Sequence, residues 1–259
     1  MMRSGSRVWA PLVFLAVALV VWEAAVRVTE VRPQVLPAPS RVASMGWEHR
    51  ATILDHTLAT LGVTAAGFGL SLLCAWVLAI LADFFPTVRR GLMPLLVASQ
   101  TIPVIAIAPL MVIWFGFGLW PKMLVVALVT FFPIVVGLVE GFASADGQAS
   151  GLLRSMGAGK VRGFLLVRLP SALPGFFTSL RIGITYAVTG AIFAEYVGAQ
   201  QGLGIYMSVQ KNAFRTDLVL AAVAITALVS VALYLSTHLL ERLVIPWHLE
   251  QRKATANDA

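Results

Sequence analysis

Two carboxylates are the side chains best placed for acid–base chemistry. Glu140 and Glu195 each lie at an end of a long apolar segment, where a carboxylate could move protons or pair with a cation. The apolar segments that carry them are long enough to cross a membrane, and the two residues fall at opposite faces of it, so they do not converge on one site. The chain has neither a Gly-x-Ser-x-Gly nor a His-Glu-x-x-His motif. We therefore expect no catalytic residue and no cofactor.

Metal and nucleotide sites are also not indicated. The chain lacks the Gly-x-x-x-x-Gly-Lys-Ser/Thr loop that cradles ATP phosphates. The single Cys74 excludes a disulfide framework within the chain. The spacing of the histidines is not typical of a metal site; they are His49, His56, His238 and His248. Any energy for uphill transport must therefore come from a partner.

A basic insert at residues 151–174 separates two apolar segments. It carries Arg154, Lys160, Arg162 and Arg168, and each such charge costs a few kcal/mol at the centre of a bilayer. The insert must therefore leave the membrane, and its positive charge favours the cytoplasmic side. The alternative is an ordinary basic loop.

The same insert has a helical pattern. Its apolar side chains recur at roughly helical spacing between the basic ones, which predicts two short amphipathic helices. Gly157 is the expected hinge, and Pro170 and Pro174 are expected to end the element.

The spacing within this insert resembles the cytoplasmic EAA signature of binding-protein-dependent ABC transporter permeases. Gly157-Ala158 is followed at the expected distance by Val167 and by Leu169-Pro170, but Gly151-Leu152-Leu153 stands where that family often has Glu-Ala-Ala. The resemblance implies a coupling loop over residues 146–172 that docks into a separate ATPase subunit. It assigns coupling to Gly151, Leu152, Leu153, Arg154, Met156, Gly157, Ala158, Val167, Leu169 and Pro170. It also implies a second permease copy, expected to be identical, and an extracytoplasmic solute-binding protein.

Composition independently indicates an integral membrane protein in contact with lipid. The 259 residues are 59% hydrophobic and only 12% charged, which excludes an ordinary soluble domain. The net charge of +7 is too small and too dispersed for a nucleic-acid-binding surface.

About 20 apolar residues cross a bilayer, and the chain has room for six such spans. We expect an all-α fold of about six transmembrane helices with a cytoplasmic coupling helix. The resemblance implies the transmembrane domain of a type I ABC importer in a bacterial plasma membrane. The predicted spans cover residues 8–26, 57–82, 93–115, 122–140, 176–197 and 218–240.

The first run could be a signal peptide, but it is long and has no clean cleavage site. We divide the chain into an N-terminal span and outer connection (1–54), a permease domain (55–243) and a tail (244–259). Ser40 is expected to cap a short outer helix over residues 41–50. Basic residues concentrate in the loops assigned to the inside, which predicts that both termini are cytoplasmic.

Polar residues in two spans indicate a translocation path. The third span contains prolines at 94, 103 and 109, which predict a kinked helix, and we place Gln100, Thr101 and Pro103 on the path. Thr185, Tyr186 and Thr189 share one helical face of the fifth span. Glu195 could gate this path or pair with Lys211, or it could lie in water. Gln100 could instead bond a neighbouring helix.

The residues around Gln100 bear on the substrate. Ser99-Gln100-Thr101-Ile102-Pro103 resembles permeases for thiamine-related pyrimidine precursors or riboflavin, whereas residues 113–116 also resemble sulfonate, taurine and nitrate permeases. A neutral amide suits an uncharged heterocycle. Functions of another class are an ion-driven secondary carrier and a membrane enzyme, but no inverted repeat and no mid-span ionisable pair is evident.

Overall fold

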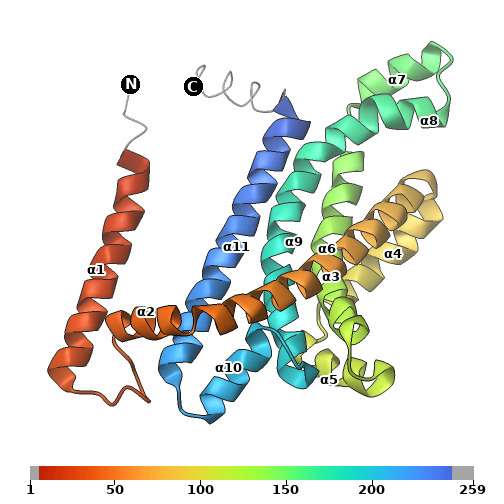
Figure 1. The fold of residues 1–259 in the computed structure, drawn as a ribbon. Coiled ribbons are helices and arrows are strands. Elements are labelled where there is room, and N and C mark those ends of the chain that lie inside the picture. The colour runs from red at the N-terminus through yellow and green to blue at the C-terminus, as the bar shows by residue number, and fades with distance from the viewer. Residues whose placement is uncertain (1–5, 247–259) are drawn as a thin grey trace.

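The computed structural model describes residues 6–246, and every regular element in that range is a helix (Figure 1). The α-helices are α1 (Ser6–Thr29), α2 (Pro39–Glu48), α3 (Arg50–Phe84), α4 (Pro86–Ser99), α5 (Val104–Phe115), α6 (Leu119–Ala143), α7 (Gly147–Ser155), α8 (Lys160–Gly163), α9 (Leu169–Gly198), α10 (Leu203–Asn212) and α11 (Thr216–Val244). A π-helical turn, η1 (Phe164–Arg168), joins α8 to α9.

Five of the six predicted spans are confirmed as single long apolar helices. They are α1, α3, α6, α11 and the helical stretch Lys160–Gly198, which comprises α8, η1 and α9. Each has an apolar window long enough to cross a bilayer.

The prediction of one kinked helix over residues 93–115 is wrong. The chain forms two short helices, α4 and α5, separated by residues 100–103. Pro103 has no N–H to continue the helical ladder. The hydroxyls of Ser99 and Thr101 donate to the carbonyls of Leu96 (2.7 Å) and Ala98 (2.8 Å), which satisfies backbone groups at the break. Pro94 and Pro109 lie inside their helices and do not end them.

The core of the fold is the contact of α6 with α9, the most extensive helix pair within the described residues. A Cβ added to Gly137 would overlap the Ser179 side chain, with Ser179 Cβ only 2.6 Å away. A Cβ on Gly141 would lie 2.8 Å from Ala172 Cα. The two backbones therefore approach as closely as small residues permit, which is a common basis of helix association in lipid.

The third core helix, α3, packs on α6 through one of the three glycines in the second predicted span. A Cβ on Gly67 would lie 2.6 Å from Val126 Cβ, so the two helices pack closely at this position. Gly62 and Gly69 have no atom within 4 Å of an added Cβ and take no part in this contact.

The expected cap at Ser40 is also wrong. Helix α2 begins at Pro39 after Ala38 and has no side-chain cap. The Ser40 hydroxyl and N–H instead donate to the carboxylate of Glu23 on α1, at 2.7 and 3.0 Å. This contact ties the end of α1 to the start of α2.

The helices place distinct features at the two ends of the molecule. Helix α1 begins and α11 ends at the end that carries α7 and α8, which we name the α7–α8 end (Figure 1). Helices α5 and α10 and the start of α6 lie at the opposite end, named the α10 end (Figure 1).

Two charged residues near the ends of the spans differ in their surroundings. Arg181 on α9 pairs with Glu241 on α11 at 2.9 Å, whereas Glu140 on α6 is exposed.

The α6–α9 contact generates a stability prediction. Gly141→Ala should lower the free energy of unfolding by about 1–3 kcal/mol, because the new methyl group meets backbone that cannot turn away. Gly69→Ala is the matched control, since its methyl group enters open space within a helix. The measurement is denaturant unfolding of the purified protein in mixed micelles. Equal stabilities for the two variants would contradict the described packing.

Candidate functional site

The first candidate site is the pair of short helices at the α7–α8 end. Asp146 caps α7, because its carboxylate accepts the N–H of Gln148 at 2.8 Å. The helix ends in a Schellman motif, in which the Ala158 N–H donates to Leu153 O and the Gly157 N–H donates to Arg154 O. Gly157 has φ +81°, a conformation that favours glycine. The predicted short first helix and the break at Gly157 are confirmed, but the predicted second short helix is wrong, because α8 continues into a helical stretch that runs to Gly198.

This surface combines exposed apolar and basic side chains. Leu152, Met156 and Val161 are between 60 and 74% exposed. Arg154, Lys160 and Arg162 are exposed beside them, whereas Leu153 and Ala158 are half-buried. Large apolar side chains in an exposed basic segment are typical of a protein–protein contact. We use the name coupling surface for the exposed side chains of residues 151–162.

The prolines do not end this element, contrary to the sequence prediction. Pro170 follows a π-helical turn, and Pro174 lies within α9, so neither residue ends the helix. The π-helical turn precedes Pro170, with the Leu169 N–H bonded to Phe164 O five residues earlier. The helical backbone consequently runs for 39 residues from Lys160 to Gly198. Val167, Leu169 and Pro170 are half-buried along it and are not on the coupling surface.

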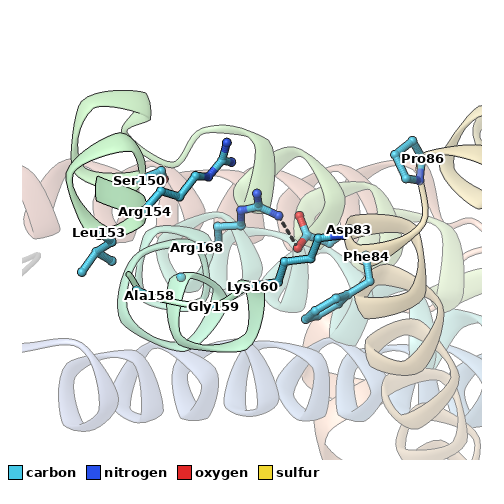
Figure 2. A pocket seen from close by; sticks show the side chains of 11 residues that line it. Asp83, Phe84, Pro86, Ser150, Leu153, Arg154, Ala158, Gly159, Lys160 and Arg168 are labelled. Atoms are coloured by element: carbon cyan, nitrogen blue, oxygen red, sulfur yellow. Dashed lines mark hydrogen bonds and ion pairs between the residues drawn. The ribbon is translucent and has the colours of Figure 1, made fainter. Parts of the chain in front are cut away.

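Two contacts attach the coupling surface to the core. Arg168 donates to Asp83 at the end of α3 at 2.7 Å, as the dashed line in Figure 2 shows. Phe164 is buried, with its ring 5.4 Å from that of Phe84 and 5.2 Å from that of Phe142. A cavity of about 530 Å³ lies between α7, α8 and the end of α3. These contacts join the start of the long helical stretch directly to α3 and α6.

The second candidate site is a groove along α6 and α9. Gln100, Tyr186 and Thr189 line one cavity of about 460 Å³, so the structure brings together three of the predicted path residues. Apolar walls come from Val129, Phe132, Pro133 and Phe193, among others. Thr101, Pro103 and Thr185 are exposed but are not part of this lining.

Glu195 lies elsewhere, and both of the surroundings expected for it are wrong. The side chain is 0% exposed, so it is not in water, and no ion pair within residues 6–246 joins it to Lys211. Its Oε2 accepts hydrogen bonds from the Thr60 hydroxyl (3.0 Å) and the Gly204 N–H (2.8 Å). Its Oε1 has no hydrogen-bond partner in the described part of the chain.

Two residues that the sequence analysis did not place at this contact, Thr60 and His56, complete it. The Leu203 N–H donates to the Thr60 hydroxyl oxygen at 2.8 Å, and the Gly202 N–H donates to His56 Nδ1 at 3.0 Å. Residues on α3 and α9 thus bind the N–H groups that begin α10, as acceptors do at helix N-termini. The signal available in the sequence was Gly202-Leu203-Gly204 after Glu195, because a Cβ at either glycine would collide with Glu195.

Comparisons with known proteins agree with this architecture. Residues 67–247 match the family described as binding-protein-dependent transport system inner membrane component. The formylaminopyrimidine transport permease protein ThiX of Halalkalibacterium halodurans is 36% identical over 96% of this chain and 100% of its own length. The riboflavin transport system permease protein RibX of Chloroflexus aurantiacus is 38% identical over 91% of this chain and 88% of its own.

A solved structure has the same fold. The membrane chain of an amino acid ABC transporter crystallised with histidines superimposes with a TM-score of 0.65 at 15% identity, over 78% of this chain and 98% of that chain. The chain therefore belongs to the binding-protein-dependent transport system inner membrane components, the permease subunits of ABC importers with the type I transmembrane fold.

Proposed function

We propose that this permease subunit carries a small planar nitrogen heterocycle inward, using ATP hydrolysed by a separate ATPase subunit that binds the coupling surface. The observation that carries the proposal is the continuous helical backbone from Lys160 to Gly198. It begins in an exposed apolar and basic surface and ends beside the buried Glu195 contact. A force applied at Lys160 therefore reaches the opposite end along one helical backbone.

The protein that binds the coupling surface is, in this proposal, the ATPase subunit. Met156 and Leu152 are large apolar side chains exposed at an end that also presents Arg154 and Lys160, so a partner with an apolar pocket and acidic rim would bury both kinds of group. Gly151-Leu152-Leu153 offers no carboxylate, so the contact relies on apolar burial and on the basic side chains.

Orientation follows from the ends of the molecule. The α7–α8 end carries Arg89, Arg90, Arg154, Lys160 and Arg162, which favours a cytoplasmic position. Helix α1 begins and α11 ends at this same end (Figure 1), which supports a cytoplasmic position for both termini. The α10 end then faces the solute-binding protein. Two identical permease copies, each bound to one ATPase, complete the importer in the bacterial inner membrane.

The cavity lined by Gln100, Tyr186 and Thr189, which we name the inner cavity, favours an uncharged heterocycle as the substrate. The side chains that line it include no lysine, arginine, aspartate or glutamate. Gln100, Tyr186 and Thr189 supply hydrogen-bond donors and acceptors between apolar walls, which suits a flat polar ring. A thiamine-related pyrimidine precursor agrees with the relative for formylaminopyrimidine, and riboflavin is the second candidate. Nitrate, sulfonate or taurine would enter this cavity without a balancing charge.

Reconstitution tests the whole proposal. We expect liposomes that contain the permease, its ATPase and the binding protein to accumulate radiolabelled formylaminopyrimidine only when ATP is supplied. Riboflavin and taurine are the comparison solutes. Accumulation of taurine and of neither heterocycle would reject the proposed substrate class. Uptake by the permease alone, without its ATPase and under an ion gradient, would reject the importer mechanism.

The hinge generates a sharper prediction. Gly157→Val should reduce uptake about tenfold while membrane insertion stays normal, because a side chain at φ +81° costs about 1–2 kcal/mol and distorts the turn between α7 and α8. Gly159→Val is the matched control, since Gly159 has φ −71° and equally open surroundings. Uptake assays on both variants decide the matter, and equal uptake by the two would remove the hinge from the coupling mechanism.

The Arg168–Asp83 ion pair generates a third test. Asp83→Leu and Arg168→Leu should each raise the number of ATP molecules hydrolysed per solute imported, because each leaves a partly buried charge unpaired and loosens the coupling surface from α3. The double variant should be less impaired than the sum of the two single variants. Strict additivity of the two effects would show that the pair does not act as a unit.

A further inference from the structure

A second cavity lies at the α10 end and is separate from the predicted path residues. Its volume is about 880 Å³, it is open on one side, and it is lined by the start of α6 and by the segment that links α9 to α10. Its chemistry comes from five side chains: Lys122, Gln200 and Gln201 are polar, and Phe117 and Tyr196 are aromatic. It thus combines hydrogen-bond donors with flat apolar surfaces.

Lys122 is not explained by the stability of its own helix. It lies near the N-terminus of α6, where the helix dipole disfavours a positive charge. It is half-buried, and none of the ion pairs within residues 6–246 includes it. Its positive charge acts on the buried carboxylate of Glu195 from a distance, and its ammonium donors can still reach a molecule in the cavity.

The cavity at the α10 end, which we name the outer cavity, continues the inner cavity along the same groove between α6 and α9. Thr189 and Phe193 line the inner cavity, and Tyr196 and Val197 line the outer one. These positions are three to four residues apart on α9 and so share one helical face. Lys122 and Val129 on α6 are two helical turns apart, on one face as well. A solute leaving the outer cavity inward would reach Thr189 after about 10 Å.

The polar wall of the outer cavity is held in place. The link between α9 and α10 contains Gln200 and Gln201, and the backbone just after it is bound by Glu195 and His56. Gly202, with φ +128°, makes the turn that brings the N–H of Gly204 onto Glu195. Three backbone hydrogen bonds thus hold this short loop on its α10 side, counting the bond from the Leu203 N–H to Thr60. This support fixes the backbone next to Gln200 and Gln201, whose side chains are exposed.

The aromatic wall is also constrained. Phe117 lies between Gly116 at φ +72° and Gly118 at φ +148°, which permits a sharp turn before α6. The Phe117 ring lies against Gly198, where an added Cβ would be 3.1 Å from the ring. The turn and this contact set one wall of the cavity.

We propose that Lys122, Gln200 and Gln201 form an outer selection site, which captures the solute by its hydrogen-bond acceptors before the solute passes to Gln100. The proposal rests on the proposed function and deepens it. The ligand class is a small planar solute with carbonyl or formyl oxygens at its edge. Formylaminopyrimidine and riboflavin both belong to this class. The ammonium of Lys122 and the two amides donate to the oxygens, and Phe117 and Tyr196 contact the ring.

The test uses the complete importer in liposomes, with permease, ATPase and binding protein. The probe is whichever of labelled formylaminopyrimidine and riboflavin the wild-type importer accumulates. Lys122→Met should reduce uptake about tenfold, the effect of losing one hydrogen bond to a charged group. ATP hydrolysis should stay at the wild-type rate, so ATP consumed per solute imported rises about tenfold.

Two variants serve as controls. Lys122→Arg keeps the positive charge and the donors, and should retain most of the uptake. Lys211→Met removes an exposed lysine from α10 at the same end of the molecule, outside the lining of the cavity, and should leave uptake unchanged. The double variant Gln200→Leu with Gln201→Leu should raise ATP consumed per solute as Lys122→Met does.

The outcomes separate this inference from the proposed function. If the wild-type importer accumulates neither heterocycle, the substrate assignment fails whatever the variants do. If uptake and ATP hydrolysis fall together in Lys122→Met, Lys122 acts by anchoring α6 at lipid headgroups, and the outer selection site is rejected. If Lys122→Met consumes the same number of ATP molecules per solute imported as the wild type, the outer selection site is rejected as well.

Discussion

The close approach of the α6 and α9 backbones is the contact on which the other features of this protein depend. Within lipid, burial of apolar surface gives helices little reason to associate, so van der Waals contact between small residues must hold them. Gly137 and Gly141 let α6 lie directly against Ser179 and Ala172 of α9. Helix α3 joins this pair at Gly67. Both cavities of the groove lie along α6 and α9, so their shape is set by the same contact.

The structure also explains how one helical backbone serves both ends. From Lys160 to Gly198 it passes through the ion pair of Arg168, the glycine contacts with α6 and the groove, and it carries Glu195 near its end. Each contact is with a different neighbour: α3 at Asp83, α6 at its glycines and α10 at Gly204. A change in tilt of this backbone therefore alters the coupling surface and the outer cavity at the same time.

Much of this arrangement could be predicted from residue patterns because the controlling forces are local. Hydropathy identified five spans, since each must be apolar over about 20 residues. The hinge at Gly157 was recognisable from a glycine between two amphipathic runs. The break between α4 and α5, the continuity through Pro170, and the burial of Glu195 were not predicted. The burial of Glu195 depends on a partner distant in sequence, Thr60, and the continuity through Pro170 depends on a π-helical turn that leaves no pattern in composition. The break at residues 100–103 is local, but prolines at 94 and 109 that do not end their helices made Pro103 indistinguishable from them.

The break between α4 and α5 has a consequence for biogenesis. With 14 and 12 residues, the two helices measure about 21 and 18 Å, and neither alone crosses a hydrocarbon layer of about 30 Å. A translocon cannot release this segment into the bilayer as an independent helix, because the backbone at residues 100–103 would meet lipid. Helix α4 packs on α3, but α5 packs on α6 and α9, which are synthesised later. Integration of α5 must therefore wait for helices that follow it in the chain, so assembly in the membrane departs from the order of translation.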